Sequence, residues 1–149
     1  MDPLSITMAT IGLTTFCGQA IKILLKFAGE LSSVDLTIKL FSDEVANLSC
    51  ILKSITASSK DQSILSLAAG TGHEAQHWRD VLKCLGDCRS CIARLVNILE
   101  KLESDDGNIF KRARRQLRLS IESGEMAVLR RQILSFTQTM QISLQMLLL

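Results

Sequence analysis

Apolar residues recur at intervals of three and four through most of this chain, which is the spacing of one helical face. The clearest run alternates four and three without a break: Val34, Ile38, Phe41, Val45, Leu48, Leu52 and Ile55. A second run keeps the same alternation: Trp78, Val81, Leu85, Cys88, Ile92, Leu95, Leu99 and Leu102. Such seven-residue repeats are typical of helices that pack against one another in a bundle.

Two further long helices are predicted at the ends of the chain. Asp2-Pro3 favours a helix start, because Asp is a good N-cap and Pro suits the first helical position. The stripe that follows is Ile6, Ala9, Leu13, Phe16, Ala20, Leu24, Phe27 and Leu31. The last helix carries Met126, Leu129, Ile133, Phe136, Met140 and Leu147, with Ser143 interrupting. A short helix before it is anchored by Phe110, Ala113, Leu117 and Ile121.

Polar segments separate these helices. Ser32-Ser33 is expected to cap the second helix, and residues 56–73 are expected to form a loop. Thr71 and Glu74 fit a capping box for the third helix.

Glycines mark one boundary and two positions inside the first helix. Ser123-Gly124 predicts a break before the last helix. Gly12 and Gly18 weaken the first helix and are expected to permit close approach of another backbone.

The sequence therefore predicts an all-α fold, an up-down bundle of four long helices plus one short basic helix. The 149 residues are most simply one domain, residues 1–149, which we expect to be the N-terminal part of a longer protein. The residues predicted for the core are Phe16, Leu24, Phe41, Leu48, Trp78, Leu85, Leu95, Phe136 and Met140.

Charge changes this picture, because it is distributed unevenly around a net value of only +2. Residues 3–21 and 132–149 contain no charged side chain, whereas residues 111–131 contain seven Lys/Arg and two Asp/Glu. A surface helix normally has a charged outer face. The two uncharged helices are therefore expected to be covered by each other, by a partner or by lipid. Alternatively, the first helix is the central helix of the bundle, buried on all sides.

Neither uncharged segment is a convincing transmembrane span. A span needs ~20 predominantly apolar residues, and Thr or Gln residues interrupt both segments.

Five thiols are present, an odd number, and with no visible signal peptide they favour a reduced, cytoplasmic protein: Cys17, Cys50, Cys84, Cys88 and Cys91. Three of them share one side of the third helix with His73 and His77. Cys84 and Cys91 are roughly 10 Å apart along a straight helix, too far to share a zinc ion with Zn–S bonds of ~2.3 Å. We predict small buried thiols, no metal site and no cofactor.

No arrangement of Ser, His, Asp or Cys suggests nucleophilic catalysis. The segment Gly70-Thr71-Gly72 lacks the Gly-Lys-Ser/Thr that completes a phosphate loop. We do not expect an enzyme.

The basic segment, residues 111–118, allows three interpretations: a solvated helix face, a surface for anionic lipid headgroups, or a nucleic-acid contact. Each Lys or Arg near an anionic leaflet contributes about 1 kcal/mol. Aromatic stacking residues are missing around the segment, which disfavours single-strand binding, so no nucleic-acid partner is expected. The residues predicted to meet an anionic lipid or an acidic partner are Lys111, Arg112, Arg114, Arg115 and Arg118.

A family resemblance starts with the opening motif Met1-Asp2-Pro3-Leu4-Ser5-Ile6-Thr7. It resembles the start of HeLo-like N-terminal domains on fungal STAND (NLR-like) proteins, including the type named after an azaphilone pigment cluster protein. The likeness continues through the heptad-like helices, the basic segment and the long Leu/Gln/Ser helix, and so spans essentially the whole chain. Relatives often carry a Trp within the basic segment, whereas residues 111–121 contain none.

The resemblance implies a bundle akin to the four-helix domain of the necroptosis pseudokinase and the coiled-coil domains of plant NLRs. It implies an effector or signalling role in fungal innate immunity, heterokaryon incompatibility and programmed cell death. In better understood relatives, oligomerisation frees an N-terminal helix that permeabilises membranes. Carried over to residues 4–27, that membrane-active helix presents Leu4, Ile6, Met8, Ile11, Leu13, Phe16, Leu24 and Phe27.

The expected partners are therefore other copies of this chain and anionic membrane lipids, with other helical signalling domains as a further class. The expected location is the cytoplasm, with recruitment to a membrane on activation. The alternative is an adaptor or homo-oligomerisation module without membrane activity. A third and more remote interpretation, an enzyme of secondary metabolism, is suggested only by the naming of relatives.

Overall fold

The computed structural model describes residues 3–29, 33–60, 72–104 and 110–148. Within these ranges the chain forms helices α1 Pro3–Ala28, α2 Leu36–Lys60, α4 Gly72–Ser104, α5 Phe110–Ser123 and α6 Glu125–Leu148, and no strand. The predicted all-α bundle of four long helices and one short basic helix is confirmed.

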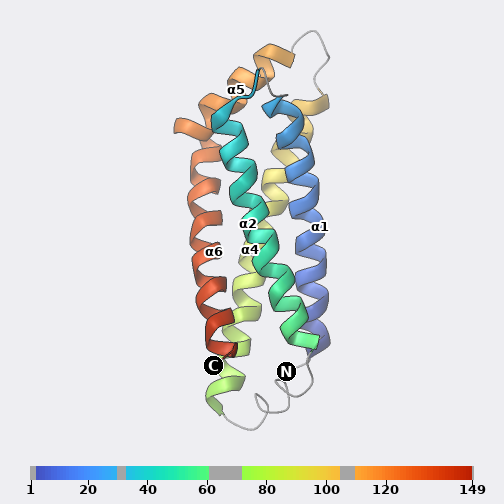
Figure 1. Ribbon diagram of the computed structural model, residues 1–149, viewed down its shortest axis with the longest axis vertical. Helices are drawn as coiled ribbons and strands as arrows, with labels where there is room; N and C mark the ends of the chain where they lie inside the picture. Colours follow the sequence, from blue (N-terminus) through green and yellow to red (C-terminus); the bar gives the residue numbers. More distant parts are fainter. Residues whose placement is uncertain (1–2, 30–32, 61–71, 105–109, 149) are drawn as a thin grey trace.

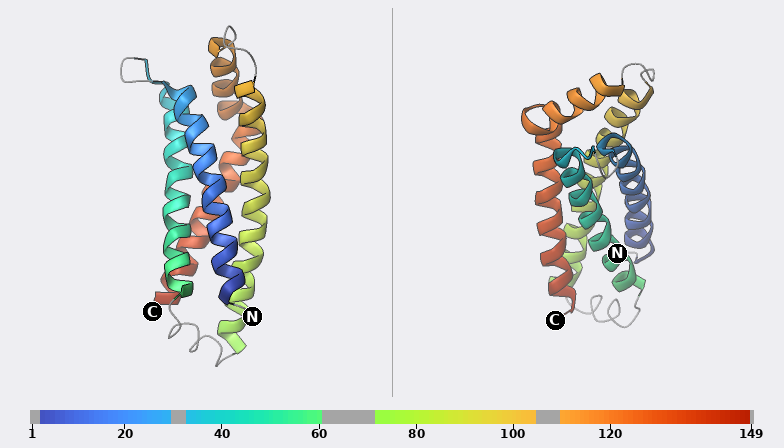
Figure 2. Two further views of the ribbon diagram at one scale, coloured as in Figure 1. Left: turned by 90° about the vertical axis from the view of Figure 1, so that its right-hand side faces the viewer. Right: turned by 45° about the horizontal axis from the view of Figure 1, so that its top comes forward.

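The four long helices alternate in direction and form a ring (Figure 1, Figure 2). Helix α1 packs between α2 and α4, and α6 packs against the same two helices from the other side. The short helix α5 crosses the end of the bundle where α1 ends and where α2 and α6 begin. Both chain termini lie toward the opposite end.

The core follows the predicted stripes of α2 and α4. Six α2 positions from Ile38 to Ile55 are fully buried, and the α4 seam positions through Leu99 are buried as well. Of the residues predicted for the core, Phe16 and Phe136 are only partly buried, and the other seven are buried. The heptad pattern is reliable in these two helices because apolar side chains occupy nearly every inward position.

The stripe of α1 is shifted from its prediction by one residue at two points. Thr10 and Cys17 are fully buried, whereas the predicted Ala9 and Phe16 are only partly buried. Thr10 can enter the core because its hydroxyl donates to a backbone carbonyl, Ile6 O at 3.0 Å, and accepts from Thr56 Oγ1 of α2 at 2.6 Å. Leu31 lies outside the described residues.

The suggestion that α1 is buried on all sides is wrong. In a ring of four helices each helix keeps one outward face, and here that face includes Met8, Ile11 and Leu25, exposed by 64%, 49% and 44%. The uncharged part of α6 likewise exposes Ile142 and Met146. The charge-free segments are therefore apolar on the outside as well as in the core.

Two helix ends differ from the prediction. Helix α2 is capped by Asp35 rather than by Ser32-Ser33, since Asp35 Oδ1 accepts from the backbone N–H of Ile38 at 3.2 Å. It also continues through residues 56–60, where the sequence predicts a loop. The Thr56 hydroxyl also lies 3.0 Å from Leu52 O, a carbonyl to which it can donate in place of Thr10, and this alternative lets a residue typical of loops remain inside the helix.

The glycine interpretation is right at one boundary and wrong inside α1. The break at Ser123-Gly124 is confirmed, since α5 ends at Ser123 and α6 begins at Glu125. At Gly12 and Gly18 an added Cβ would meet no atom within 4 Å, so neither glycine serves close packing. The predicted capping box at Thr71 and Glu74 lies outside the residues whose side chains the structure describes.

Candidate functional site

Helix α5 is amphipathic, and its inner face fixes the orientation of its basic residues. Ala113, Leu117 and Ile121, four residues apart, are buried against the bundle. The cations occupy the positions between these anchors, on a helix that crosses the end of the bundle close to the end of α1 and the start of α2 (Figure 1).

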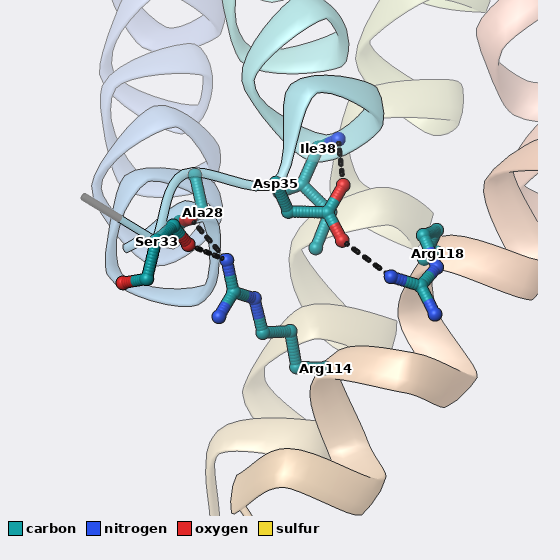
Figure 3. A network of polar contacts seen from close by, with 6 residues as sticks. All are labelled: Ala28, Ser33, Asp35, Ile38, Arg114 and Arg118. Atoms are coloured by element: carbon teal, nitrogen blue, oxygen red, sulfur yellow. Dashed lines mark hydrogen bonds and ion pairs between the residues drawn. The ribbon is translucent and has the colours of Figure 1, made fainter. Parts of the chain in front are cut away.

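Arg114 reaches the C-terminal end of α1 (Figure 3). Its Nη2 donates to Ala28 O at 2.7 Å and also to Ser33 O. Its Nε is buried and has no hydrogen-bond partner among the described residues. A guanidinium forms such a bridge well, because its donors are held in one rigid plane. Arg114 therefore ties the last carbonyl of α1 to the turn that follows.

The backbone around Arg114 is shaped to receive it. Gly29 ends α1 with φ of +87°, a conformation that favours glycine. A Cβ at Gly29 would lie 3.2 Å from Ser33 O and 3.3 Å from Arg114 Nη2. The chain after α1 consequently turns back closely enough for Ala28 and Ser33 to share one side chain.

Arg118 is paired with a buried carboxylate. Its Nη1 donates to Asp35 Oδ2 at 3.2 Å, with the Asp35 side chain 5% exposed and the Arg118 side chain 44% exposed. Because Oδ1 of the same carboxylate caps α2 at Ile38, Asp35 joins α5 to the first turn of α2 (Figure 3). The backbone N–H of Asp35 also donates to Ala28 O at 2.8 Å.

An aromatic contact completes the junction. The rings of Phe27 near the end of α1 and Phe110 at the start of α5 are stacked, with centroids 5.3 Å apart. Together, Phe110, Arg114 and Arg118 hold α5 to Phe27, Ala28, Ser33 and Asp35. We call these three side chains and their contacts the clasp.

The clasp borders an open pocket of about 700 Å³. Residues 33–37 form one wall, and the other is lined by four cations, Lys111, Arg114, Arg115 and Arg118. Among the described residues of this lining, Asp35 is the only carboxylate. The pocket is therefore strongly electropositive, and it suits an anion that presents several oxygens.

The five predicted basic residues thus divide into two groups. Lys111, Arg112 and Arg115 are exposed, and no ion pair involves them among the described residues. Arg114 and Arg118 are engaged within the fold. The segment 111–118 is neither a uniformly solvated face nor a uniformly free surface.

The residues predicted for the membrane-active helix are also divided. Ile6, Leu13, Leu24 and Phe27 are buried in the core, and Phe16 is partly buried. Only Met8 and Ile11 of this set are exposed, and the side chain of Leu4 lies outside the described part. Most of the predicted apolar surface would become accessible only if α1 left the bundle.

Four of the five thiols lie on α1 and α4, and Cys50 lies on α2. Cys17, Cys88 and Cys91 are buried, Cys84 is partly buried and Cys50 is exposed. Burial raises the pKa of Cys17 to about 12 and that of Cys91 to about 11. Burial also raises the pKa of Cys88 and, to a smaller extent, that of Cys84, where the charge of Asp87 adds to the effect. These thiols stay neutral near pH 7, as expected for packing residues.

In the described part of the chain, no group of three or more His, Cys, Asp or Glu residues is placed so that it could hold a metal ion. The side chain of His73 falls outside that part. The prediction that the thiols pack rather than bind metal stays a prediction for the chain as a whole.

Among the described helices, Ile6–Ala28 is long and apolar enough to cross a membrane by length and composition, and 33% of its most apolar stretch is buried. Core helices of soluble proteins pass the same test, so this finding is weak evidence for a span.

Comparisons of the chain with protein-family models, with curated proteins and with solved structures find no match. The fold and the surface by themselves define a class of protein: an all-α bundle domain with a basic helix across one end. The resemblance to fungal NLR-like N-terminal domains stays a prediction.

Sequence reasoning missed the inner partners of α5. Asp35 lies off the apolar stripe that predicts the second helix, so the pattern predicts an outward position for its side chain. The pattern also does not identify Gly29 as the residue that ends the first helix. A signal was present, because Gly followed within six residues by Asp before an apolar repeat is a typical helix–turn–helix boundary.

Proposed function

We propose that this domain is an N-terminal effector or signalling module of an NLR-like immune or regulated cell-death protein, which acts by self-association and by binding anionic membranes. The observation that carries the proposal is the pairing of two surfaces on one bundle. One is the basic helix α5, on which Lys111, Arg112 and Arg115 are exposed and form no ion pair among the described residues, and the other is the outer face of α1 without any charge from residue 3 to residue 21.

The basic surface supplies the first contact. Exposed cations near an anionic leaflet contribute about 1 kcal/mol each, and salt screens this attraction over about 10 Å. Lys111, Arg112 and Arg115 together suffice for reversible attachment, while α5 remains anchored through its buried face.

The apolar surface supplies the second contact. Met8 and Ile11 are exposed on a helix that has neither acid nor base to keep it in water. Ile11 lies roughly 25 Å along α1 from its end at Ala28, beside α5. Because the two surfaces are far apart, we infer two steps, with α5 attaching first and α1 entering the membrane after it loosens from the bundle.

Vesicle binding and leakage test the proposal. Purified domain is mixed with vesicles containing phosphatidylserine or only phosphatidylcholine, and both flotation and dye release are measured. Arg112→Glu/Arg115→Glu should reduce flotation on the anionic vesicles by about tenfold or more. Lys53→Glu/Lys83→Glu, which reverses two exposed cations on α2 and α4, makes the same change in net charge; it is the matched control and should bind as the wild type does.

Substitutions on α1 separate attachment from leakage. Met8→Gln/Ile11→Gln should leave flotation intact and lower dye release, because the change is confined to exposed positions of α1. Absence of binding to anionic vesicles by the wild type would contradict the proposal.

A second candidate function is a helical interaction module without membrane activity. It is favoured by exposed large apolar side chains on several helices, among them Leu36 at 77%, Leu40 at 51% and Ile142 at 57%. Concentration-dependent dimers or larger oligomers, measured by sedimentation with vesicles remaining intact, would support this function over the first.

A further inference from the structure

We propose that the clasp couples anion binding to release of α1: a phosphate-bearing anion that enters the pocket beside α5 draws Arg114 away from the end of α1 and loosens that helix. This inference deepens the proposed function and rests on it for the source of the anion, a phosphate headgroup at a membrane surface. It names the event that connects attachment through α5 with exposure of α1.

Two of the cations that line the pocket make no described polar contact within the fold. Lys111 and Arg115 line it, and no ion pair or side-chain hydrogen bond involves them among the described residues. They provide positive charge to an incoming anion without breaking any contact. Asp35 opposes the anion from the other wall, which makes entry selective for a ligand with more than one negative charge.

Arg114 is the clasp residue that an anion attracts most readily. Its present acceptors, Ala28 O and Ser33 O, are neutral carbonyls, and its buried Nε has no partner among the described residues. A guanidinium binds a phosphate more strongly than it binds a neutral carbonyl, because phosphate oxygens carry negative charge and can accept two parallel N–H···O bonds. Arg118 differs, because it already faces the carboxylate of Asp35.

Loss of Arg114 weakens the end of α1 in particular. Ala28 O retains the N–H of Asp35, but the bridge from α1 to the turn at Ser33 is gone. The only ion pair that joins described residues of α1 to another helix is Lys26–Glu103, which is exposed at 3.4 Å and contributes little. The last turns of α1 are then held chiefly by packing and by the Phe27–Phe110 contact.

Hydrogen exchange of the α1 amides tests this inference in solution, without lipid. Inorganic pyrophosphate is titrated at constant ionic strength, with chloride as the balancing anion. Amides of residues 24–29 in the wild type should exchange about tenfold faster when pyrophosphate is bound. In Arg114→Lys, which keeps the charge but loses the planar fork, they should exchange faster before any pyrophosphate is added.

Two variants of α5 serve as matched controls. Arg115→Gln should exchange as the wild type does without pyrophosphate, and should need about fivefold more pyrophosphate to respond. Arg112→Gln carries the same charge change on the same helix but does not line the pocket, so its response should equal that of the wild type. Phosphatidic acid vesicles form a second arm. A response to them as well as to pyrophosphate assigns the pocket to a lipid headgroup, and a response to pyrophosphate alone assigns it to a free phosphate.

The inference is overturned if pyrophosphate leaves the amides of residues 24–29 unchanged or protects them, or if Arg114→Lys exchanges as the wild type does. Flotation distinguishes this failure from failure of the proposed function. Domain that binds anionic vesicles with unchanged α1 amides contradicts only the clasp. Domain that responds to pyrophosphate but ignores every vesicle contradicts only the membrane role.

Discussion

The half of the bundle near α5 and the half near the termini are held together by different forces. All five ion pairs among the described residues lie in the α5 half, including Arg130–Glu44, Arg94–Glu125 and Arg118–Asp35. In the half near the termini, the described polar contact between helices is the pair of hydroxyls Thr10 and Thr56. The first half is joined by directional contacts and the second mainly by apolar packing.

This difference shows how one fold can combine an end that is held by specific contacts, which a ligand can break, with an end that is held by packing. Apolar packing is non-directional, so α1 can exchange contacts with α2 and α4 for contacts with lipid or with another copy. Ion pairs and bridged carbonyls are specific to one geometry, and they keep α5 and the start of α2 in register. The releasable half of α1 is also its charge-free half.

The largest expected effect is in the apolar half. Leu52→Ala removes a fully buried side chain from α2 near the termini and should lower the free energy of unfolding by ~2–5 kcal/mol. Urea unfolding followed by circular dichroism measures the change. A loss smaller than that caused by Glu44→Gln in the other half would contradict the idea that packing dominates this half.

The thiols at the middle of the bundle predict a loss of stability in alkali. The pKa of Cys17 is raised to about 12 and that of Cys91 to about 11, above the value of 9.0 for a free thiol. A buried thiol with a raised pKa stays protonated in the folded state at pH values where the unfolded thiol ionises, so its full contribution to stability is present only below the pKa of the unfolded thiol. As the pH rises above 9 the unfolded state gains stability by losing these protons, so the folded state is progressively disfavoured up to pH 11 and 12. Between pH 8 and about pH 10.5, the wild type should lose ~2 kcal/mol more than Cys17→Ala, measured by urea unfolding with a reductant present.

In the α5 half, the pair Arg130–Glu44 joins α6 to α2 through two hydrogen bonds. Both guanidinium contacts are short, 2.7 and 2.6 Å, and the Glu44 side chain is 14% exposed. The hydrogen bonds to Glu44 raise the pKa of Arg130 above its ordinary value. Glu44→Gln should cost ~1–2 kcal/mol. Asp43→Asn, which removes only the exposed pair with Lys39, should change stability by less than ~0.5 kcal/mol.

The smallest effects contrast the two glycines inside α1 with the glycine that follows this helix. Gly12→Ala and Gly18→Ala meet no atom, so each should stabilise the domain by ~0.5–1 kcal/mol through helix propensity. Gly29→Ala should destabilise it by ~1 kcal/mol or more, because φ is +87° and Ser33 O is close. Thermal melting of the three variants gives the comparison, and a stabilising Gly29→Ala would refute the tight turn at the clasp.

The sequence predicted the bundle well where apolar residues alone define the inner face. Every α2 heptad position from Ile38 to Ile55 is buried, because no polar residue competes for that stripe. In α1 the pattern was less accurate, because Thr10 is a polar residue that becomes buried once Thr56 of α2 faces it. Spacing within one helix cannot reveal a hydroxyl partner 46 residues away.

The sequence predicted which basic residues form the site but not which contacts each of them makes. The basic run was evident, and its buried anchors Ala113, Leu117 and Ile121 follow from their spacing. Arg115 is exposed and Arg114 is hydrogen-bonded because of where Ser33 lies in the fold. The contact between Arg114 and Ser33 joins residues 81 positions apart in the sequence. The carbonyl oxygens that Arg114 binds belong to the backbone, so no side-chain pattern indicates them.

Thiol labelling of Cys17 is the most direct test of the claim that α1 leaves the bundle at an anionic membrane. Cys17 is fully buried on α1, while Cys50 on α2 is exposed and reports total reagent. The wild type is treated with a maleimide in buffer, with phosphatidylcholine vesicles and with phosphatidylserine vesicles, and the labelled peptides are identified by mass spectrometry. We predict that Cys50 is labelled in all three cases and Cys17 only with phosphatidylserine. Domain that floats with phosphatidylserine vesicles while Cys17 remains protected would contradict the release of α1.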